Sequence, residues 1–85
     1  MKIEIYSKPN CTFCDRTKFT FEVIRQKYIE YVLEKDFTKE QFIEKFGQST
    51  FPRIIINDEL IGGFSELQSI IVENKLETYF NSKTI

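Results

Sequence analysis

The alternation of apolar and polar residues near the start of the chain predicts a β-strand. Residues Lys2 to Tyr6 read K-I-E-I-Y, so Ile3 and Ile5 lie on the same face of that strand. The sequence S-K-P-N follows directly and is typical of a loop. We therefore expect the strand to end there and a new element to begin a few residues later.

A helix is predicted from about Thr12 to Lys27, because mostly apolar residues recur at helical spacing after Cys14. The recurring positions are Thr17, Phe21, Ile24 and Tyr28. Phe19 and Val23 form a second apolar pair beside this stripe. We expect this second pair to belong to the core rather than to a functional site.

The next segment, Y-I-E-Y-V-L-E over residues 28–34, is rich in aromatic and β-branched residues and predicts a second strand. Thr38 is followed three residues later by Gln41, the pattern of a capping box at the start of a helix. We predict a short helix over residues 38–46, with Gly47 in the left-handed position after its last turn. The apolar residues of this helix are Phe42, Ile43 and Phe46. We expect Phe42 and Phe46 to be core residues.

Two strand-like runs, R-I-I-I-N and E-L-I-G, meet at Asn57 and Asp58 and predict a β-hairpin. Ser65 with Gln68 repeats the capping-box pattern and predicts the start of a third helix. The apolar face of that helix is Leu67, Ile70 and Ile71. One more helical turn is predicted near the end of the chain, from Leu76, Tyr79 and Phe80.

The predicted order is β-α-β-α-β-β-α in an α/β fold. The first strand, helix and second strand imply a right-handed crossover between parallel strands, and the hairpin adds antiparallel ones. We expect a four-stranded mixed sheet with helices on both faces. With 85 residues, the chain forms one domain over residues 1–85.

Composition narrows the function classes. The net charge is −1, and the charges are scattered, so nucleic acid is not the expected partner. No apolar run approaches the roughly 18 residues of a membrane span, and the first residues lack a secretion-signal pattern. We therefore expect a cytoplasmic protein. The chain has no histidine, which removes histidine-based catalysis and most zinc sites.

The candidate chemistry lies in the only two cysteines, Cys11 and Cys14, which stand three residues apart. They follow the first predicted strand and open the first predicted helix. Unpaired N–H groups and the helix dipole favour a thiolate at that position, so we expect Cys11 to have a lowered pKa. Cys14 lies one turn further on the same side, where its sulfur can attack a disulfide formed at Cys11. One sulfur therefore attacks, and the other resolves.

Other uses of the two cysteines are less consistent with the sequence. A structural disulfide over so short a loop would contribute little in a reducing compartment. A structural zinc site needs four ligands, and the chain offers two cysteines and no histidine. Two inert buried cysteines remain an alternative, although their sequence neighbours are polar.

These motifs together resemble the glutaredoxin family, in particular the small dithiol type of bacteria and their phages. The resemblance rests on K-P-N-C-T-F-C (residues 8–14), T-F-P-R-I (50–54) and I-G-G-F-S-E-L (61–67), at the family's spacing. It implies a thioredoxin-like fold, a cis bond between Phe51 and Pro52, and reduction of protein disulfides and glutathione mixed disulfides at the expense of glutathione.

The resemblance also implies a glutathione site. We expect Lys8 to meet the glycyl carboxylate, the backbone of Phe51 to pair with the extended tripeptide, and the turn at Gly62 and Gly63 to receive the γ-glutamyl carboxylate. The predicted contact residues are Lys8, Phe13, Thr50, Phe51, Pro52, Gly63, Phe64 and Ser65. Weaker candidates are Gln48, Ser49, Arg53 and Glu66.

The chain departs from the family pattern at two places. Family members usually carry Pro-Tyr between the cysteines, whereas this chain has Thr12 and Phe13. Phe51 stands where valine is usual, and we expect only its backbone to make contacts. The first departure leaves the reduction potential and the binding of an iron–sulfur cluster open.

The resemblance implies three kinds of partner: glutathione, glutathionylated or disulfide-containing proteins, and ribonucleotide reductase. We expect the protein to be a monomer. We expect it in the cytoplasm, or in the host cytoplasm if it is encoded by a phage. No resident metal is expected. Two alternatives stay open. One is a thioredoxin-type reductant fed by a flavoprotein reductase, against which stand the absent tryptophan and the paired glycines. The other is a carrier of a [2Fe–2S] cluster shared by two protomers through Cys11 and two glutathiones.

Overall fold

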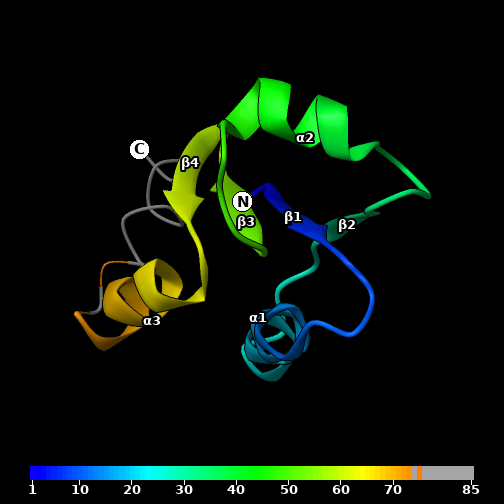
Figure 1. Cartoon of the computed structure of the whole chain (residues 1–85). Coiled ribbons are helices and arrows are strands. Elements are labelled where there is room, and N and C mark those ends of the chain that lie inside the picture. Colours follow the sequence, from blue (N-terminus) through cyan, green and yellow to red (C-terminus); the bar gives the residue numbers. More distant parts are fainter. Residues whose placement is uncertain (74, 76–85) are drawn as a thin grey trace.

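The computed structural model describes residues 1–73 and residue 75 (Figure 1). Its elements, in chain order, are β1 (Ile3–Ser7), α1 (Thr12–Val23), β2 (Ile29–Val32), α2 (Lys39–Phe46), β3 (Arg53–Ile56), β4 (Glu59–Gly62) and α3 (Phe64–Val72). This confirms the predicted order. The turn predicted from Leu76, Tyr79 and Phe80 lies outside the described residues.

The four strands form one mixed sheet in the order β2-β1-β3-β4. Strand β1 pairs in parallel with β2, while the β1–β3 and β3–β4 pairs are antiparallel. Helix α2 covers one face of the sheet, and α1 and α3 lie on the other (Figure 1). The predicted four-stranded sheet with helices on both faces is therefore confirmed.

The side of the sheet that carries α1 and α3 holds the aliphatic core. Ile3 and Ile5 of β1 lie on this face because side chains alternate along a strand. The cluster of buried residues is Ile3, Ile5, Phe21, Ile54, Ile56 and Leu67. Its members come from two strands and two helices, so this one cluster fixes α1 and α3 against the central strands.

The opposite face is aromatic. Tyr6, whose ring lies on the other side of β1, contacts Phe37 and Phe46 at ring-centroid distances of 5.2 and 4.9 Å. Phe42 of α2 is buried and stacks on Phe51 at 4.2 Å. This aromatic cluster, formed by Tyr6, Phe37, Phe42, Phe46 and Phe51, holds α2 on the sheet. The core assignment of Phe42 is confirmed, and Phe46 is half-buried.

The core assignment of Phe19 and Val23 is wrong. Their side chains are 65% and 62% exposed, whereas Thr17 and Phe21 are fully buried. Successive helical residues are rotated by about 100°, so Phe19 stands about 200° from both buried neighbours and faces solvent. Helix α1 also ends at Val23, earlier than predicted, and Arg25 adopts a positive φ of 60°.

The turns and caps follow the sequence with one exception. Asn57 and Asp58 have φ of 52° and 67° between β3 and β4, as a two-residue hairpin loop requires, and both halves of the Thr38 capping box form. The predicted cap at Ser65 is wrong. The cap is Gly63, two residues earlier, and helix α3 begins at Phe64, because the Glu66 carboxylate accepts the Gly63 N–H at 2.6 Å and closes the first turn there.

A polar network joins α1 to the two parallel strands. The buried Ser7 hydroxyl donates to Glu30 Oε2 at 2.6 Å, and Lys18 Nζ lies 3.0 Å from the same oxygen. Burial tends to raise the pKa of Glu30, but the bonds from Ser7 and Lys18 outweigh it and lower that pKa below its ordinary value. The hydrogen bond to Glu30 raises the pKa of Lys18.

Over residues 1–73 and 75, no helix combines the length and the apolar character needed to cross a bilayer.

The contrast between two phenylalanines of α1 can be tested by unfolding in urea. Phe21→Ala removes a buried ring and should lower the free energy of unfolding by about 3–5 kcal/mol. Phe19→Ala, two residues away and exposed, should change it by less than about 0.5 kcal/mol. If the Phe21→Ala variant does not fold, Phe21→Leu should still unfold at lower urea than Phe19→Ala. Equal losses at the two positions would contradict the assigned face of the helix.

Glu30 should make stability depend on pH in acid. Its folded-state pKa is lower than its ordinary value of 4.5, so the unfolded chain takes up the proton first. Stability contributed by this carboxylate is present above pH 4.5 and is lost as the pH falls toward its folded-state pKa. Glu30→Gln should therefore be less stable at pH 7 and should lose less stability between pH 5 and 3.

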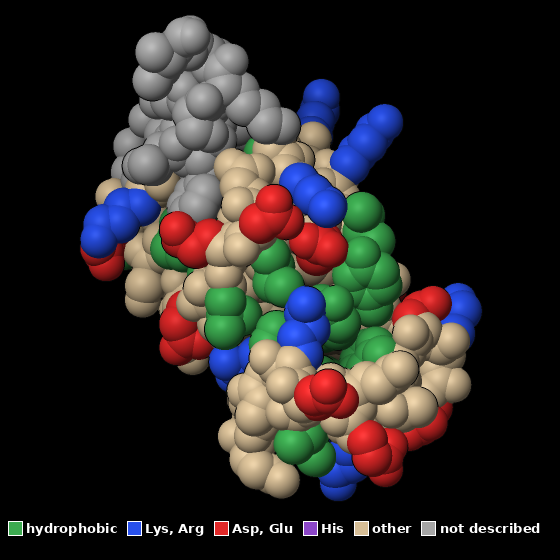
Figure 2. Space-filling model, turned by 90° about the horizontal axis from the view of Figure 1, so that it is seen from above, with side chains coloured by type: hydrophobic (Ala, Val, Ile, Leu, Met, Phe, Trp, Pro, Cys, Tyr) green, Lys and Arg blue, Asp and Glu red, His purple; other side chains and the backbone are tan. Residues whose placement is uncertain are grey.

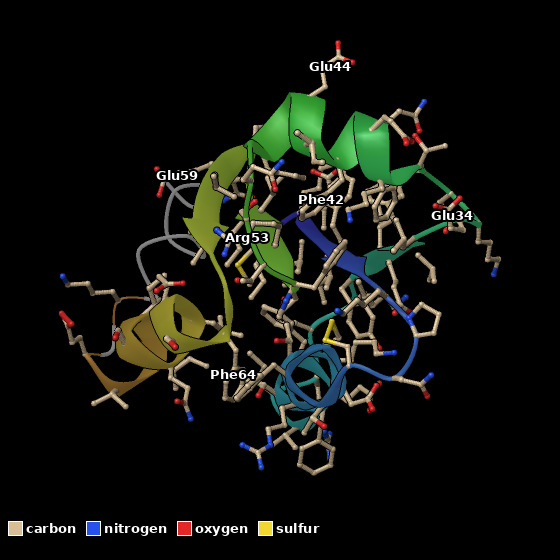
Figure 3. The ribbon with its side chains drawn as sticks, viewed as in Figure 1. Glu34, Phe42, Glu44, Arg53, Glu59 and Phe64 are labelled. Carbon is tan, nitrogen blue, oxygen red and sulfur yellow. A yellow bond between two sulfur atoms is a disulfide. The ribbon has the colours of Figure 1, made fainter. Side chains whose placement is uncertain are left out.

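The free energy of unfolding measured against pH by urea titration tests this. Glu44→Gln, at a position that points away from the fold (Figure 3), is the matched control and should follow the wild-type curve. A Glu30→Gln curve parallel to the wild-type curve would reject the role assigned to Glu30.

Candidate functional site

The two cysteines stand at the N-terminus of α1 and are joined in a disulfide. Cys11 is the residue that caps the helix, and its sulfur accepts the Cys14 N–H at 3.1 Å. The N–H of Asp15 donates to the Cys11 carbonyl oxygen at 3.1 Å and continues the first turn. The sulfur of Cys11 therefore occupies the position where helix N–H groups and the helix dipole stabilise a negative charge.

The two sulfurs differ in access. Cys11 is 8% exposed and Cys14 is 1% exposed, so an incoming disulfide reaches the outer residue first. The Thr17 hydroxyl donates to the Phe13 carbonyl oxygen at 2.8 Å and ties the segment between the cysteines to the helix. In the reduced protein this arrangement favours a reactive thiolate at Cys11, with Cys14 behind it to close the disulfide.

The second segment of the site is the loop before β3. The peptide bond between Phe51 and Pro52 is cis, which confirms the expectation from the resemblance. Arg53 folds back along this loop, because its Nε donates to the Thr50 carbonyl oxygen at 2.8 Å and its Nη2 to Thr50 Oγ1 at 3.2 Å. Pro52 is fully buried, and Thr50 is bonded to Arg53, so both ends of the Thr50–Pro52 loop are fixed.

A groove of about 740 Å³ brings four parts of the chain together: the cysteine segment, the start of α2, the loop before β3 and the start of α3. Its lining residues are Lys8, Phe13, Lys39, Gln48, Ser49, Thr50, Phe51, Pro52, Arg53, Gly63, Phe64, Ser65 and Glu66. All eight predicted glutathione contacts and all four weaker candidates lie in this set. Phe13 lies between the two cysteines and lines the groove, so the groove extends to the disulfide.

The sequence analysis missed Lys39, the first residue of α2. It lies far in the sequence from the three motifs that predict the glutathione site, and only the packing of α2 on the sheet brings it to the groove. Together with Lys8 and Arg53 it gives the groove three cationic side chains against one carboxylate, that of Glu66. The groove therefore favours an anionic ligand.

The paired glycines have different roles. Gly62 has a φ of 123°, and an added Cβ would lie 2.8 Å from Glu66 Oε1, so both the backbone and the space require glycine there. Gly63 has an ordinary φ of −105°, and its added Cβ would lie 3.4 Å from the Pro52 carbonyl oxygen. Glu66, a candidate ligand contact, instead accepts the Gly63 N–H.

The expectation that Phe51 makes only backbone contacts is wrong. Its ring stacks on Phe42 at 4.2 Å, with 17° between the ring planes, and packs on Phe37 at 6.2 Å. The Lys8 ammonium lies 5.6 Å from the centroid of the same ring. A valine could not reach these partners in the same way, so the phenylalanine extends the aromatic cluster under α2 into the groove.

A second hollow, of about 540 Å³, lies beside α2. Figure 2 looks onto this side and shows hydrophobic side chains between charged residues of both signs. Its lining residues are Tyr6, Phe37, Gln41, Phe42, Glu44 and Lys45. Neither cysteine and no predicted glutathione contact belongs to it, so it lies outside the candidate site. In the described part of the chain, no three metal-ligating side chains of the His, Cys, Asp or Glu type gather into a cluster.

Known proteins that are similar to this chain belong to one family. A family model described as glutaredoxin matches residues 3–61. A probable glutaredoxin of Synechocystis is 33% identical over 78 residues, which cover 89% of this chain and 72% of that protein. Glutaredoxin 3 of Escherichia coli is 29% identical, over 88% of this chain and 92% of its own length.

Solved structures show the same fold. Glutaredoxin 1 from Francisella tularensis, complexed with cacodylate, matches with a TM-score of 0.75 and 30% identity, covering 85% of this chain and 93% of its own. A buckwheat glutaredoxin–glutathione complex matches with a TM-score of 0.81 and 23% identity, covering 94% of this chain and 76% of its own. The predicted thioredoxin-like fold is thereby confirmed.

Proposed function

The chain belongs to the glutaredoxin family, and we propose that it uses glutathione as the reductant for the chemistry of its dithiol. Family membership and the Cys11–Cys14 pair make it a thiol–disulfide oxidoreductase. The observation that carries the glutathione proposal is the groove next to the disulfide, which holds three cationic side chains and one carboxylate. Glutathione has two carboxylates and one ammonium group, so its charges complement this set.

In the proposed reaction with a glutathionylated substrate, the Cys11 thiolate attacks the glutathione sulfur. A bond forms between Cys11 and glutathione, and the substrate leaves as a thiolate. A second glutathione thiolate then attacks the bound glutathione sulfur and releases the Cys11 thiolate with glutathione disulfide. Overall, the mixed disulfide and one glutathione thiol become one substrate thiol and one glutathione disulfide.

For a protein disulfide, the proposed reaction uses both cysteines. Cys11 attacks one substrate sulfur and forms a mixed disulfide, and Cys14 then attacks Cys11 to release the fully reduced substrate. The oxidised pair that results is the disulfide seen in the structure. Glutathione returns the pair to the dithiol in two exchanges. The burial of Cys14 suits this role, because it protects the resolving sulfur from outside disulfides.

We propose that glutathione lies in the groove with its cysteine sulfur toward Cys11. Lys8 pairs with the glycyl carboxylate, and the backbone of Phe51 pairs with the extended tripeptide, since Pro52 has no N–H to offer. The first turn of α3, at Phe64 and Ser65, receives the γ-glutamyl carboxylate. A buckwheat protein of the same fold has been solved as a complex with glutathione, which supports glutathione as the ligand.

The proposed setting is the cytoplasm, where glutathione keeps the dithiol reduced, and the proposed form is a monomer. Disulfide-containing and glutathionylated proteins are the proposed partners, with ribonucleotide reductase among them. These proposals rest on family membership. The absent tryptophan and the groove at Gly63 favour glutathione over a flavoprotein reductase as the source of electrons.

The first test is turnover of a small glutathione mixed disulfide, coupled through glutathione reductase to NADPH oxidation. Cys11→Ser should reduce turnover to the uncatalysed rate, because it removes the attacking sulfur. Cys14→Ser should keep turnover of this substrate and lose reduction of protein disulfides that need a resolving sulfur.

A parallel assay coupled through thioredoxin reductase separates the alternatives. Turnover in that assay alone would reject the glutathione proposal. Silence in both assays, with a coloured species after anaerobic reconstitution, would favour the cluster carrier. Substantial turnover by Cys11→Ser would reject the assigned nucleophile.

The second test narrows the groove. Gly63→Leu places a large side chain against Pro52 and Arg53 and should raise KM for the glutathione mixed disulfide about tenfold, which corresponds to about 1.4 kcal/mol. Ser69→Leu, on the exposed face of the same helix, is the matched control and should leave KM unchanged.

Circular dichroism of both variants checks that the fold is retained. Should Gly63→Leu fail to fold, Lys8→Gln at the exposed end of the groove should raise KM in the same direction. An unchanged KM in the folded Gly63→Leu variant or in Lys8→Gln would contradict the proposed position of glutathione.

A further inference from the structure

An aromatic pair lies beside the disulfide, and one of its two rings is exposed. Phe13, between the two cysteines, is 52% exposed, and its ring lies 5.8 Å from the ring of Phe64. Figure 3 shows Phe64 at the start of α3 on the side toward α1. The Arg16 guanidinium lies 5.6 Å from the centroid of the Phe13 ring. Aromatic and arginine side chains in contact with each other are typical of the centres of protein interfaces.

A second cation–aromatic pair lies across the groove. The Lys8 ammonium stands 5.6 Å from the centroid of Phe51, and both Phe13 and Phe51 line the groove. We call these five residues the cation–aromatic rim: Lys8, Phe13, Arg16, Phe51 and Phe64. Four of them, Lys8, Phe13, Phe51 and Phe64, also line the groove of the proposed glutathione site. Arg16 does not line the groove, so the glutathione proposal leaves it without a role.

The rim has the opposite sign to the whole chain, whose net charge is −1. The two acidic side chains closest to the rim in sequence are already engaged. Asp15 lies 3.6 Å from Lys18 Nζ, and Glu66 accepts the Gly63 N–H at 2.6 Å. The charges of Lys8 and Arg16 therefore face an approaching partner, and they attract a negatively charged one.

We propose that the rim docks a protein segment that carries an acidic residue next to its disulfide cysteine. The substrate carboxylate pairs with Arg16, and the neighbouring part of the segment lies on the exposed face of Phe13. The docking brings the substrate sulfur to Cys11 in the same step. The inference uses the dithiol chemistry alone, so it stands or falls independently of glutathione.

The test uses the reduced protein and three synthetic peptides, each a symmetric disulfide dimer with one cysteine. The residues beside the cysteine are glutamate, glutamine or lysine. Cys11 attacks one peptide sulfur and releases one peptide thiol, and Cys14 then attacks Cys11 and releases the second. One protein dithiol becomes a disulfide, and one peptide disulfide becomes two thiols. The second-order rate constant of this single turnover is measured without glutathione.

The readout is the ratio of the rate constants for the glutamate and lysine peptides. A change in the reactivity of Cys11 affects both peptides and cancels in this ratio. Wild type should favour the glutamate peptide, with the glutamine peptide between the two. Arg16→Gln should lower the ratio about two- to fivefold, the range of one exposed ion pair, and Arg16→Glu should lower it further. Salt at 0.5 M should bring the wild-type ratio close to that of Arg16→Gln.

Lys27→Glu is the matched control for Arg16→Glu. It makes the same change in net charge beside Met1 and Lys2, away from the groove lining, and should leave the ratio at the wild-type value. An equal ratio in wild type and Arg16→Glu would overturn the proposal. An equal fall in Lys27→Glu would also overturn it, because the preference would then come from net charge and not from the rim. Loss of glutathione-coupled turnover would leave this result unaffected.

Discussion

Strand β1 is covered on both of its faces, and this double burial determines where the reactive sulfur lies. Ile3 and Ile5 pack into the aliphatic cluster under α1 and α3, while Tyr6 packs into the aromatic cluster under α2. A strand held in this way has no freedom to slip, because a shift by one residue would exchange the two faces. The loop that follows β1 therefore delivers Cys11 to a fixed place at the start of α1.

The helix start then supplies the chemistry. The sulfur of Cys11 takes the place of the oxygen that usually caps a helix and accepts the N–H of Cys14. This one contact joins the nucleophile to the residue that resolves it. The burial of Cys14 separates their roles, since only Cys11 meets an outside disulfide first.

The aromatic cluster also shapes the ligand groove, because Phe51 belongs to both. Phe51 stacks on Phe42, and the Lys8 ammonium lies 5.6 Å from the centroid of the Phe51 ring at the groove. The packing of α2 therefore reaches the residues beside the disulfide. Phe13 and Arg16 form a similar pair on the α1 side. The chain thus has an aromatic ring with a cation on each side of its dithiol.

Sequence reasoning succeeded wherever the physics is local. The alternation around Ile3 and Ile5, the capping box of Thr38 and the loop at Asn57 and Asp58 each depend on residues only a few positions apart. It failed at Phe19, because two apolar stripes on one helix look alike until the packing shows which one faces the sheet. It failed at Ser65 because a second side chain nearby can also close the first turn. The Glu66 carboxylate accepts the Gly63 N–H, so the helix is capped at Gly63.

The sequence by itself determined the order of the elements and the type of chemistry, because the spacing of Cys11 and Cys14 and its place after a strand are local facts. Tertiary structure alone decided the shape and charge of the groove. Lys8, Lys39 and Arg53 are far apart in the chain, and they meet only because both faces of the sheet are packed. The same packing decided that Phe51 contributes its ring as well as its backbone, since the aromatic partners that receive it come from α2 and the segment before it.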